Sequence, residues 1–238
     1  DGEESSDSSL HFRLVLSSSV TPAARILLGA SKTLEDGPSD MFSGPMAATA
    51  AGLASSESRT SDGVEVSPLA MAAVGVIADK LVQHGGAALI IDYGESKAQI
   101  DTLRAFQKHK QTHPLSRPGE VDVTADVDFA AISRSGRTAG ASVLGPVTQG
   151  EFLMQMGIVQ RVERLLELES TSDTDAQHLV DAVHTLVGDS REKDCNSMGT
   201  RYKVLGMISP IDKSIDDKEK IVSLVPGFMT YSSLSSDK

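Results

Sequence analysis

The sequence predicts an α/β fold with at least some parallel strands. Residues 68–83 are apolar almost all round until Asp79 and Lys80, which predicts a helix that packs against a sheet. Residues 85–95 then carry an apolar run that is typical of a short strand buried on both faces. A helix that leads into a buried strand is half of a βαβ crossover, the unit from which parallel sheets are built.

The N-terminal region is expected to hold only part of this fold, over residues 1–30. Residues 1–9 are acidic and serine-rich, which is typical of disorder, and residues 10–16 alternate as a half-buried strand does. Thr21 is placed to cap a short helix. Residues 31–62 are rich in Ser, Gly, Ala and Asp without an apolar period, which predicts a low-complexity insertion.

The first helix and the strand after it have predicted boundaries. Ser67 is placed as the N-cap and Pro68 as the first helical residue. The apolar run of the strand ends at Asp92, and ligand-contacting residues of open α/β sheets lie just beyond the carboxyl ends of strands. This makes Asp92, Tyr93 and Gly94 candidates for a functional site. The alternative is that Asp92 only starts a turn that Gly94 completes.

The middle of the chain gives mixed signals. Residues 101–110 fit a helix or a strand, and the prolines after them mark a loop. Within 121–132, Thr124 or Asp126 is expected to cap a helix. The spaced aspartates of this stretch also occur in calcium loops, but the further ligands, central Gly and terminal Glu of such a loop are missing. Capping is therefore favoured.

Thr148 and Glu151 form a capping box at the start of a helix from Gln149 to about Met156, with Gly157 as its stop. Two amphipathic helices follow, and their ordinary role is to cover a core, although partner binding stays open. Their apolar stripes are Ile158, Val162, Leu165 and Leu166 in the first helix, and Leu179, Val180, Val183, Leu186 and Val187 in the second.

The alternation of residues 201–208 predicts a late strand with apolar side chains on both faces. Residues 209–238 are polar again apart from 221–228, and we expect them to form a tail over the surface. The strand places Tyr202, Val204 and Ile208 on one face and Leu205 and Met207 on the other.

The composition argues against several classes of function. The 238 residues carry a net charge of −11, and nucleic-acid binding needs clustered Lys and Arg instead. No apolar run approaches the ~20 residues of a membrane span, which predicts a soluble chain. The single cysteine, Cys195, excludes an intrachain disulfide and fits a reducing compartment. The chain begins with Asp1 and not Met, which indicates a fragment or a processed chain.

Common catalytic motifs are missing from the sequence. It contains no Gly-x-Gly-x-x-Gly and no Gly-x-x-x-x-Gly-Lys-Ser/Thr. The stretch around Ser142 lacks the final glycine of a nucleophile elbow, which disfavours a serine hydrolase. His109 and His113 lie four residues apart but have no evident third partner, so no metal site is predicted.

Several short motifs follow one another in a specific order along the chain. They are 63–68 (GVEVSP), 85–94 (GGAALIIDYG), 101–104 (DTLR), 118–129 (PGEVDVTADVDF), 145–153 (GPVTQGEFL), 156–158 (MGI) and 198–205 (MGTRYKVL). This set resembles the C-terminal half of the MidA family of S-adenosylmethionine-dependent methyltransferases. The resemblance covers about 63–208 and is weaker over 12–24.

The resemblance implies a Rossmann-like methyltransferase fold that is N-terminally incomplete and carries added helices. Residues 63–208 would form the C-terminal part of this domain, including a helical segment over 148–188. The methyl group would come from S-adenosylmethionine. The N-terminal half of the family, with the glycine-rich turn that holds the cofactor, has no counterpart here, so no residue of this chain is assigned to cofactor binding.

The mitochondrial members of this family are protein arginine methyltransferases that assist assembly of respiratory complex I. The resemblance therefore implies a mitochondrial protein whose acceptor is an arginine on a complex I subunit. Because a guanidinium is protonated at neutral pH, such an enzyme needs carboxylates to orient the acceptor. Asp92 is the best-placed carboxylate, Tyr93 is expected to stack on or hydrogen-bond to the acceptor, and Gln149 to add a polar contact.

A second hypothesis comes from another class of function. The protein would be a non-catalytic scaffold or assembly factor that binds a partner through its amphipathic helices and the insertion at 31–62. The sequence carries no signal for a particular oligomeric state. A domain without its first strands would leave apolar faces uncovered, which predicts poor solubility in isolation.

Overall fold

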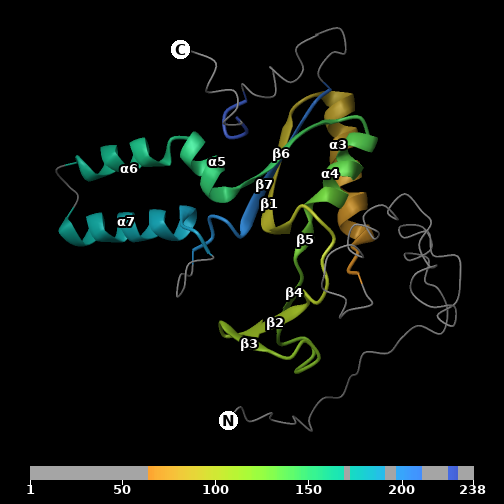
Figure 1. Cartoon of the computed structure of the whole chain (residues 1–238), viewed down its shortest axis with the longest axis horizontal. Helices are drawn as coiled ribbons and strands as arrows, with labels where there is room; N and C mark the ends of the chain where they lie inside the picture. The colour runs from red at the N-terminus through yellow and green to blue at the C-terminus, as the bar shows by residue number, and fades with distance from the viewer. Residues whose placement is uncertain (1–63, 169–171, 191–196, 211–224, 230–238) are drawn as a thin grey trace, which may run out of the picture. The chain divides into compact units, whose positions relative to one another are not determined.

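The computed structural model describes residues 64–168, 172–190, 197–210 and 225–229 (Figure 1). The chain splits into two compact units, one formed by Asp1–Pro68 with Lys97–Asp126 and the other by Leu69–Ser96 with Val127–Lys238. The strand and helix expected within 10–28, the insertion at 31–62 and Cys195 lie outside the described residues.

The larger unit is built on a four-stranded sheet in the order β5-β1-β7-β6. β7 pairs antiparallel with both β1 and β6, so β1 and β6 run in the same direction, and β5 pairs parallel with β1. The predicted α/β class with some parallel strands is therefore confirmed. The strands are β1 (Ala87–Glu95), β5 (Val127–Asp128), β6 (Ser142–Thr148) and β7 (Tyr202–Ile208).

Two helices, α3 (Pro68–His84) and α4 (Phe129–Thr138), pack on one face of this sheet (Figure 1). The predicted helix start at Pro68 is confirmed. Apolar side chains of both helices meet those of β7 in one core, because a helix buries its apolar stripe against the sheet. The core comprises Val74, Ala78, Leu81, Phe129, Ile132, Ala141, Leu205 and Met207.

The other face of the sheet is covered over β6 and β7 by Phe228 and its neighbours. Phe228 is buried and packs with Leu144 and Val204, and its ring lies 5.5 Å from that of Phe152. The expectation that residues 209–238 run over the surface is therefore wrong for the part around Phe228. The predicted division of β7 into two apolar faces is confirmed, since the two faces contribute to two different cores.

The same face is not covered over β1. Leu89 and Ile91 are 53% and 51% exposed, whereas Ala88 and Ile90 pack against the core beneath α3 and α4. The prediction that this strand is buried on both faces is therefore wrong within the described structure. Within the part of the chain that the structure describes, the face of Ala88 and Ile90 has helices to bury against, and the face of Leu89 and Ile91 does not.

The carboxyl end of β1 also differs from the prediction. The strand does not stop at Asp92 but continues to Glu95. Asp92 and Tyr93 pair with Lys203 and Tyr202 of β7, and this pairing keeps their backbone extended. The apolar run of the sequence ends at Asp92, but the backbone pairing with β7 continues through Tyr93.

The start of α4 corrects another expectation. Asp128, and not Thr124 or Asp126, is the N-cap, and its Oδ1 accepts a hydrogen bond of 2.9 Å from the backbone N–H of Ala131. The carboxylate of Asp126 instead pairs with Arg104. All three residue types suit an N-cap, so the choice depends on where β5 ends and not on the local sequence.

We predict that Asp128→Ala lowers the free energy of unfolding by about 1 kcal/mol, because alanine offers no acceptor to the exposed N–H groups of the first turn. Thr124→Ala is the matched control, since Thr124 lies in a strand and caps no helix. Urea denaturation followed by circular dichroism measures both variants. Equal losses in the two would contradict the assignment of the cap.

The smaller unit holds a three-stranded antiparallel sheet in the order β3-β2-β4, from β2 (Arg104–Gln107), β3 (Lys110–Thr112) and β4 (Asp122–Thr124). This resolves the open segment 101–110 as strand and turn. Lys108 and His109 have φ values of 49° and 63°, as the two central residues of a tight hairpin do.

Glu65 is hydrogen-bonded to the segment that precedes β2. Its carboxylate accepts hydrogen bonds from the backbone N–H groups of Thr102 and Leu103, at 3.0 and 3.3 Å.

His109 lies in the hairpin turn and His113 accepts a hydrogen bond from the backbone N–H of Leu115. No group of three or more metal-ligating side chains occurs among the described residues.

The helical segment is formed by α5 (Gln149–Gln155), α6 (Ile158–Leu166) and α7 (Asp173–Val187). The capping box of Thr148 and Glu151 is confirmed, and Gly157 adopts a φ of 82° between α5 and α6. α6 and α7 lie side by side and extend away from the sheet (Figure 1).

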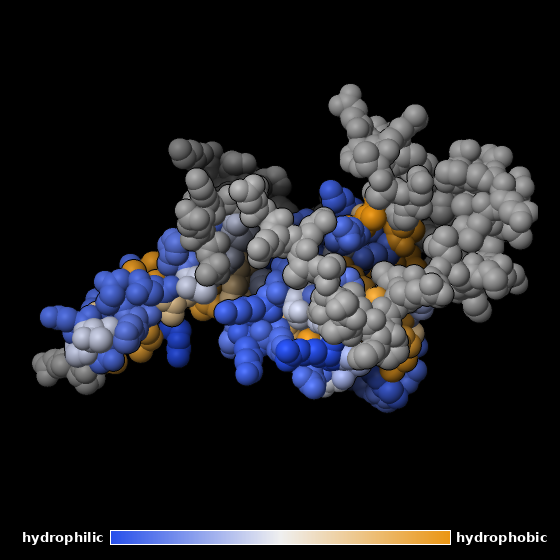
Figure 2. Space-filling view, turned by 90° about the horizontal axis from the view of Figure 1, so that it is seen from below, coloured by the Kyte–Doolittle hydropathy of each residue, from blue (hydrophilic) through white to orange (hydrophobic). Residues whose placement is uncertain are grey.

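The expectation that α6 and α7 cover a core is wrong, because neither helix contains a buried residue. Hydrophobic surface is visible over this part of the molecule, at the left of Figure 2. None of the described helices is both long and apolar enough to cross a bilayer.

Candidate functional site

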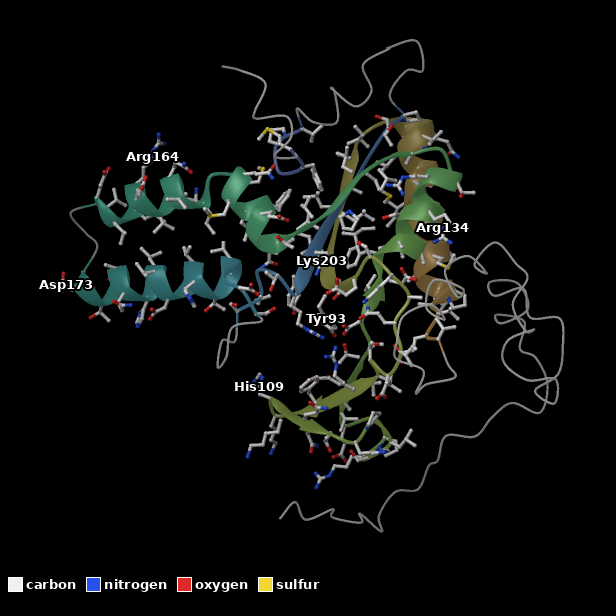
Figure 3. All side chains as sticks on the ribbon, in the orientation of Figure 1. Tyr93, His109, Arg134, Arg164, Asp173 and Lys203 are labelled. Atoms are coloured by element: carbon white, nitrogen blue, oxygen red, sulfur yellow. The ribbon has the colours of Figure 1, made fainter. Side chains whose placement is uncertain are left out.

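The register of the sheet brings the sequence candidates to one end of it. Asp92 pairs with Lys203, and Lys203 pairs with Thr148, so these residues form one row across β1, β7 and β6. Tyr93 lies one residue further along β1, and Gln149 follows Thr148 directly. Figure 3 shows Tyr93 and Lys203 at this end of the sheet.

Asp92 and Tyr93 nevertheless leave the sheet on opposite faces, because successive side chains of a strand alternate. Asp92 shares its face with Ile90, which packs against the core below α3 and α4. Tyr93 shares the other face with the exposed Ile91. A ligand that lies on one face of the sheet therefore contacts only one of the two side chains directly.

Tyr93 belongs to a small aromatic and cationic cluster. Its ring meets that of Tyr202 edge-on, with the centroids 5.4 Å apart and the planes at 81°. The guanidinium carbon of Arg201 lies 5.5 Å from the centroid of Tyr93, within the range of a cation–π interaction. The ring of Tyr93 thus already contacts a guanidinium, which is the group that an acceptor arginine would present.

The charged groups around this cluster differ in their partners. Lys203 Nζ donates to the backbone carbonyl of Thr200 at 2.7 Å and to Oε1 of Glu95 at 3.4 Å. Oδ1 of Asp92 accepts a hydrogen bond of 2.8 Å from the backbone N–H of Tyr93. Asp92 is half-buried and forms no ion pair with any described residue.

Gln149 has a structural contact at this position. Its side chain is only 8% exposed, and Nε2 donates a hydrogen bond of 2.9 Å to the backbone carbonyl of Leu186 near the end of α7. This bond joins α5 to α7. The bond occupies Nε2, so a contact between Gln149 and a guanidinium donor, as the sequence predicted, would have to use Oε1.

Sequence reasoning did not single out Arg201 and Tyr202 as site residues. Both belong to the motif at 198–205, and the signal that finds them is the pairing of Tyr202 with Tyr93, which needs the register of β1 and β7. That no residue of this chain binds S-adenosylmethionine stays a prediction. The polar end of the sheet offers side chains to an acceptor but contains no glycine-rich turn to approach a nucleotide.

Comparison with known sequences establishes the family. The profile of a family of S-adenosyl-L-methionine-dependent methyltransferases matches residues 6–147, which is more than half of the chain. The chain belongs to this family. The match starts well before residue 63, where the main resemblance was expected to begin, and it ends within β6, before the helical segment.

Curated methyltransferases extend the similarity. The chain is 42% identical over 147 residues to the protein named "Protein arginine methyltransferase NDUFAF7, mitochondrial" of Xenopus tropicalis, covering 62% of this chain and 32% of that protein. It is 36% identical over 149 residues to the human protein of the same name, covering 63% and 32%. The chain therefore spans about a third of the length of these methyltransferases.

A solved structure of an uncharacterized Burkholderia thailandensis protein matches the fold. Its TM-score is 0.55 with 28% sequence identity, over 72% of this chain and 45% of that chain. Together with the family match and the mixed sheet, this confirms the predicted Rossmann-like methyltransferase fold.

Proposed function

We propose that the whole protein transfers a methyl group from S-adenosylmethionine to an arginine side chain of another protein. The observation that carries the proposal is the 42% identity to a methyltransferase whose name states arginine as the acceptor. A mitochondrial location and an acceptor arginine on a complex I subunit are parts of the same proposal. The names of the relatives support the location, and the resemblance to the MidA family supports the acceptor.

The chemistry of the acceptor defines what this chain has to supply. Arginine is always protonated near neutral pH, and each methylated guanidinium nitrogen loses one proton as its bond to carbon forms. A carboxylate that holds the guanidinium can orient the reacting nitrogen and help to remove that proton. Asp92 is our candidate because it ends the apolar run of β1 and forms no ion pair with the described residues.

Tyr93 is the candidate for aromatic contact with the acceptor. Its ring already lies beside the guanidinium of Arg201, which supports the idea that this environment accepts such a group. An acceptor arginine on the same ring face would displace Arg201. The net charge of −11 favours the approach of a basic substrate over an acidic one.

Calorimetric titration of S-adenosylmethionine tests the proposal, with the 238-residue chain beside the full-length gene product. We expect binding by the full-length product only, because no residue of the 238-residue chain is assigned to cofactor binding. Mass spectrometry of mitochondrial complex I subunits incubated with the full-length product then identifies a methylated arginine. Binding by neither version would overturn the enzyme proposal.

A second candidate is a non-catalytic assembly factor. It is favoured by the absence of any buried residue in α6 and α7, since such helices are free to bind a partner. The same titration separates the two candidates, because a scaffold has no need to bind S-adenosylmethionine.

A further inference from the structure

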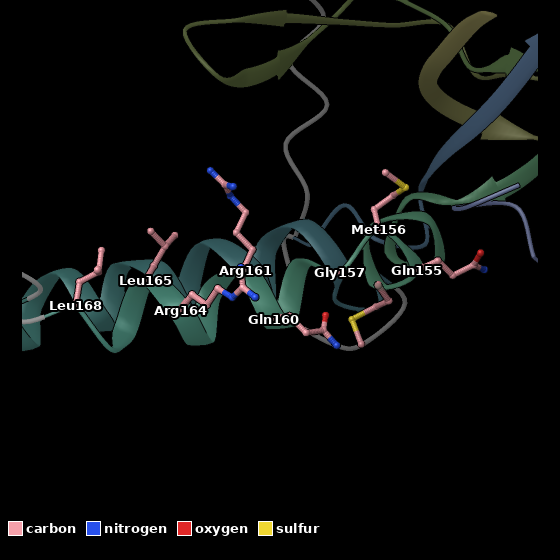
Figure 4. A pocket seen from close by; sticks show the side chains of 9 residues that line it. Gln155, Met156, Gly157, Gln160, Arg161, Arg164, Leu165 and Leu168 are labelled. Atoms are coloured by element: carbon pink, nitrogen blue, oxygen red, sulfur yellow. The ribbon is translucent and has the colours of Figure 1, made fainter.

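A groove lies where α5 turns into α6 (Figure 4). It has a volume of about 720 Å³. Met154 and Met156 come from the end of α5, Arg161, Arg164 and Leu165 come from α6, and Leu168 lies just beyond α6. We call it the α5–α6 groove.

The apolar lining of the groove is unusually exposed. Met154, Met156 and Leu168 are 51%, 55% and 52% exposed. Methionine side chains are flexible and polarizable, so they adapt to the surface of a bound partner. An apolar groove of this kind gains free energy when another apolar surface covers it.

The charge of the groove is opposite to that of the chain. Its lining includes Arg161 and Arg164 but no carboxylate, although the whole chain has a net charge of −11. Both arginines are exposed, and neither forms an ion pair within the described part of the chain. Two guanidinium groups are therefore available to carboxylates from outside.

The lining residues of α6, together with Leu168 just beyond it, follow a helical period. Gln160, Arg161, Arg164, Leu165 and Leu168 lie three, four, seven, eight and eleven residues after Gly157, so they form one continuous stripe. From Gln160 to Leu168 the stripe spans eight residues, so at 1.5 Å per residue it is about 12 Å long, or just over two turns of a helix. The length fits a short helix that lies along the groove.

The α5 side of the groove is held in place before any partner binds. The side-chain amide of Gln155 donates to the carbonyl of Met229 at 3.0 Å and accepts from its N–H at 2.9 Å. These paired bonds fix the end of α5 against a separate segment of the chain. A pre-ordered surface loses less entropy on binding than a mobile one.

We propose that the α5–α6 groove binds an acidic amphipathic helix of a partner protein. The apolar face of that helix contacts the methionines and leucines, and its carboxylates pair with Arg161 and Arg164. A membrane surface fits less well, because the site is concave and a bilayer is flat on this scale. The groove serves the enzyme and the scaffold equally, so this proposal does not depend on methyl transfer.

Fluorescence anisotropy with a labelled helical peptide tests the proposal. The probe has about 16 residues, with Leu along one helical face and Glu elsewhere, and its partner probe has Lys in place of Glu. We expect the Glu peptide to bind at least about tenfold more tightly than the Lys peptide at low salt, and less so at high salt. The double variant Arg161→Glu/Arg164→Glu is expected to reverse this preference.

The control is Lys80→Glu/Arg137→Glu, which makes the same change of net charge at exposed positions of α3 and α4. It is expected to keep the preference for the Glu peptide. Equal weakening in both double variants would show a net-charge effect and overturn the proposal. So would binding of anionic vesicles without binding of the peptide, or self-association in sedimentation that only Arg161→Glu/Arg164→Glu removes, since a second copy would then occupy the groove.

Discussion

Phe129→Ala is expected to lower the free energy of unfolding of the larger unit by about 3–5 kcal/mol, the usual cost of removing a buried aromatic side chain. Phe129 is completely buried and packs in the core with residues of α3 and β7. It is also the first residue of α4 and follows β5 directly. Its loss would leave a cavity at the point where the helix and the sheet meet.

Urea denaturation followed by circular dichroism measures this loss. Leu69→Ala is the control, because Leu69 also lies on a helix of the larger unit but is 83% exposed. Such a surface substitution changes the free energy of unfolding by no more than about 0.5 kcal/mol. A loss below about 1 kcal/mol for Phe129→Ala would contradict the assigned core. Domains of this size have a total stability of about 5–15 kcal/mol, so the expected loss removes a large part of it.

Local features of the fold were predictable from the sequence. The start of α3 at Pro68, the capping box of Thr148 and Glu151, and the stop at Gly157 agree with the structure. Each depends on hydrogen bonds or backbone angles within about four residues, so the responsible residues are neighbours in the sequence. The β7 strand was predictable too, because its side chains alternate between two faces with the two-residue period of a strand.

Features that depend on distant partners were not predictable. β1 extends past Asp92 because Lys203 and Tyr202, more than a hundred residues later, pair with it. Nothing around Asp92 records that pairing. The cap of α4 was misplaced for a similar reason, because the pairing of β5 with β1 decides that Asp128 is the last residue before the helix.

The position of the candidate site at the end of β1 was predictable, but the way its side chains are arranged was not. Strand position and family motifs led to Asp92 and Tyr93, and the sheet register places both at one polar end. That the two side chains occupy opposite faces, and that Arg201 lies over the ring of Tyr93, follows only from the paired strands. The exposure of α6 was not predictable either. Its apolar stripe would look the same in the sequence whether or not another element covered it.

Asp92→Asn is expected to lower kcat/KM for arginine methylation by at least about 100-fold, the contribution typical of a positioned acid or base. The change removes the charge that would hold the guanidinium. It keeps the side-chain oxygen that accepts the 2.8 Å hydrogen bond from the N–H of Tyr93, so the local backbone should not move. Binding of S-adenosylmethionine and the melting temperature are therefore expected to stay unchanged. The measurements use the full-length gene product.

Glu95→Gln provides the matched control. Glu95 lies on the same strand, but its carboxylate is exposed and already faces Lys203 at 3.4 Å, so we expect a change of less than about threefold. Asp92→Glu should recover part of the activity, because it restores the charge. If Asp92→Asn retained more than about a third of the activity, or if Glu95→Gln were equally damaging, the role of Asp92 would be wrong.

Tyr93→Leu separates the two faces of the sheet. Loss of the aromatic ring removes a cation–π contact worth about 0.5–2 kcal/mol, so the expected effect is at most about thirtyfold and falls mainly on KM. Because Asp92 and Tyr93 point to opposite faces, an acceptor held by the carboxylate does not lie against the ring, and Tyr93→Leu then has the smaller effect. A larger loss for Tyr93→Leu than for Asp92→Asn would place the acceptor on the face of Ile91 and Tyr93 instead, and the base would then have to come from another residue.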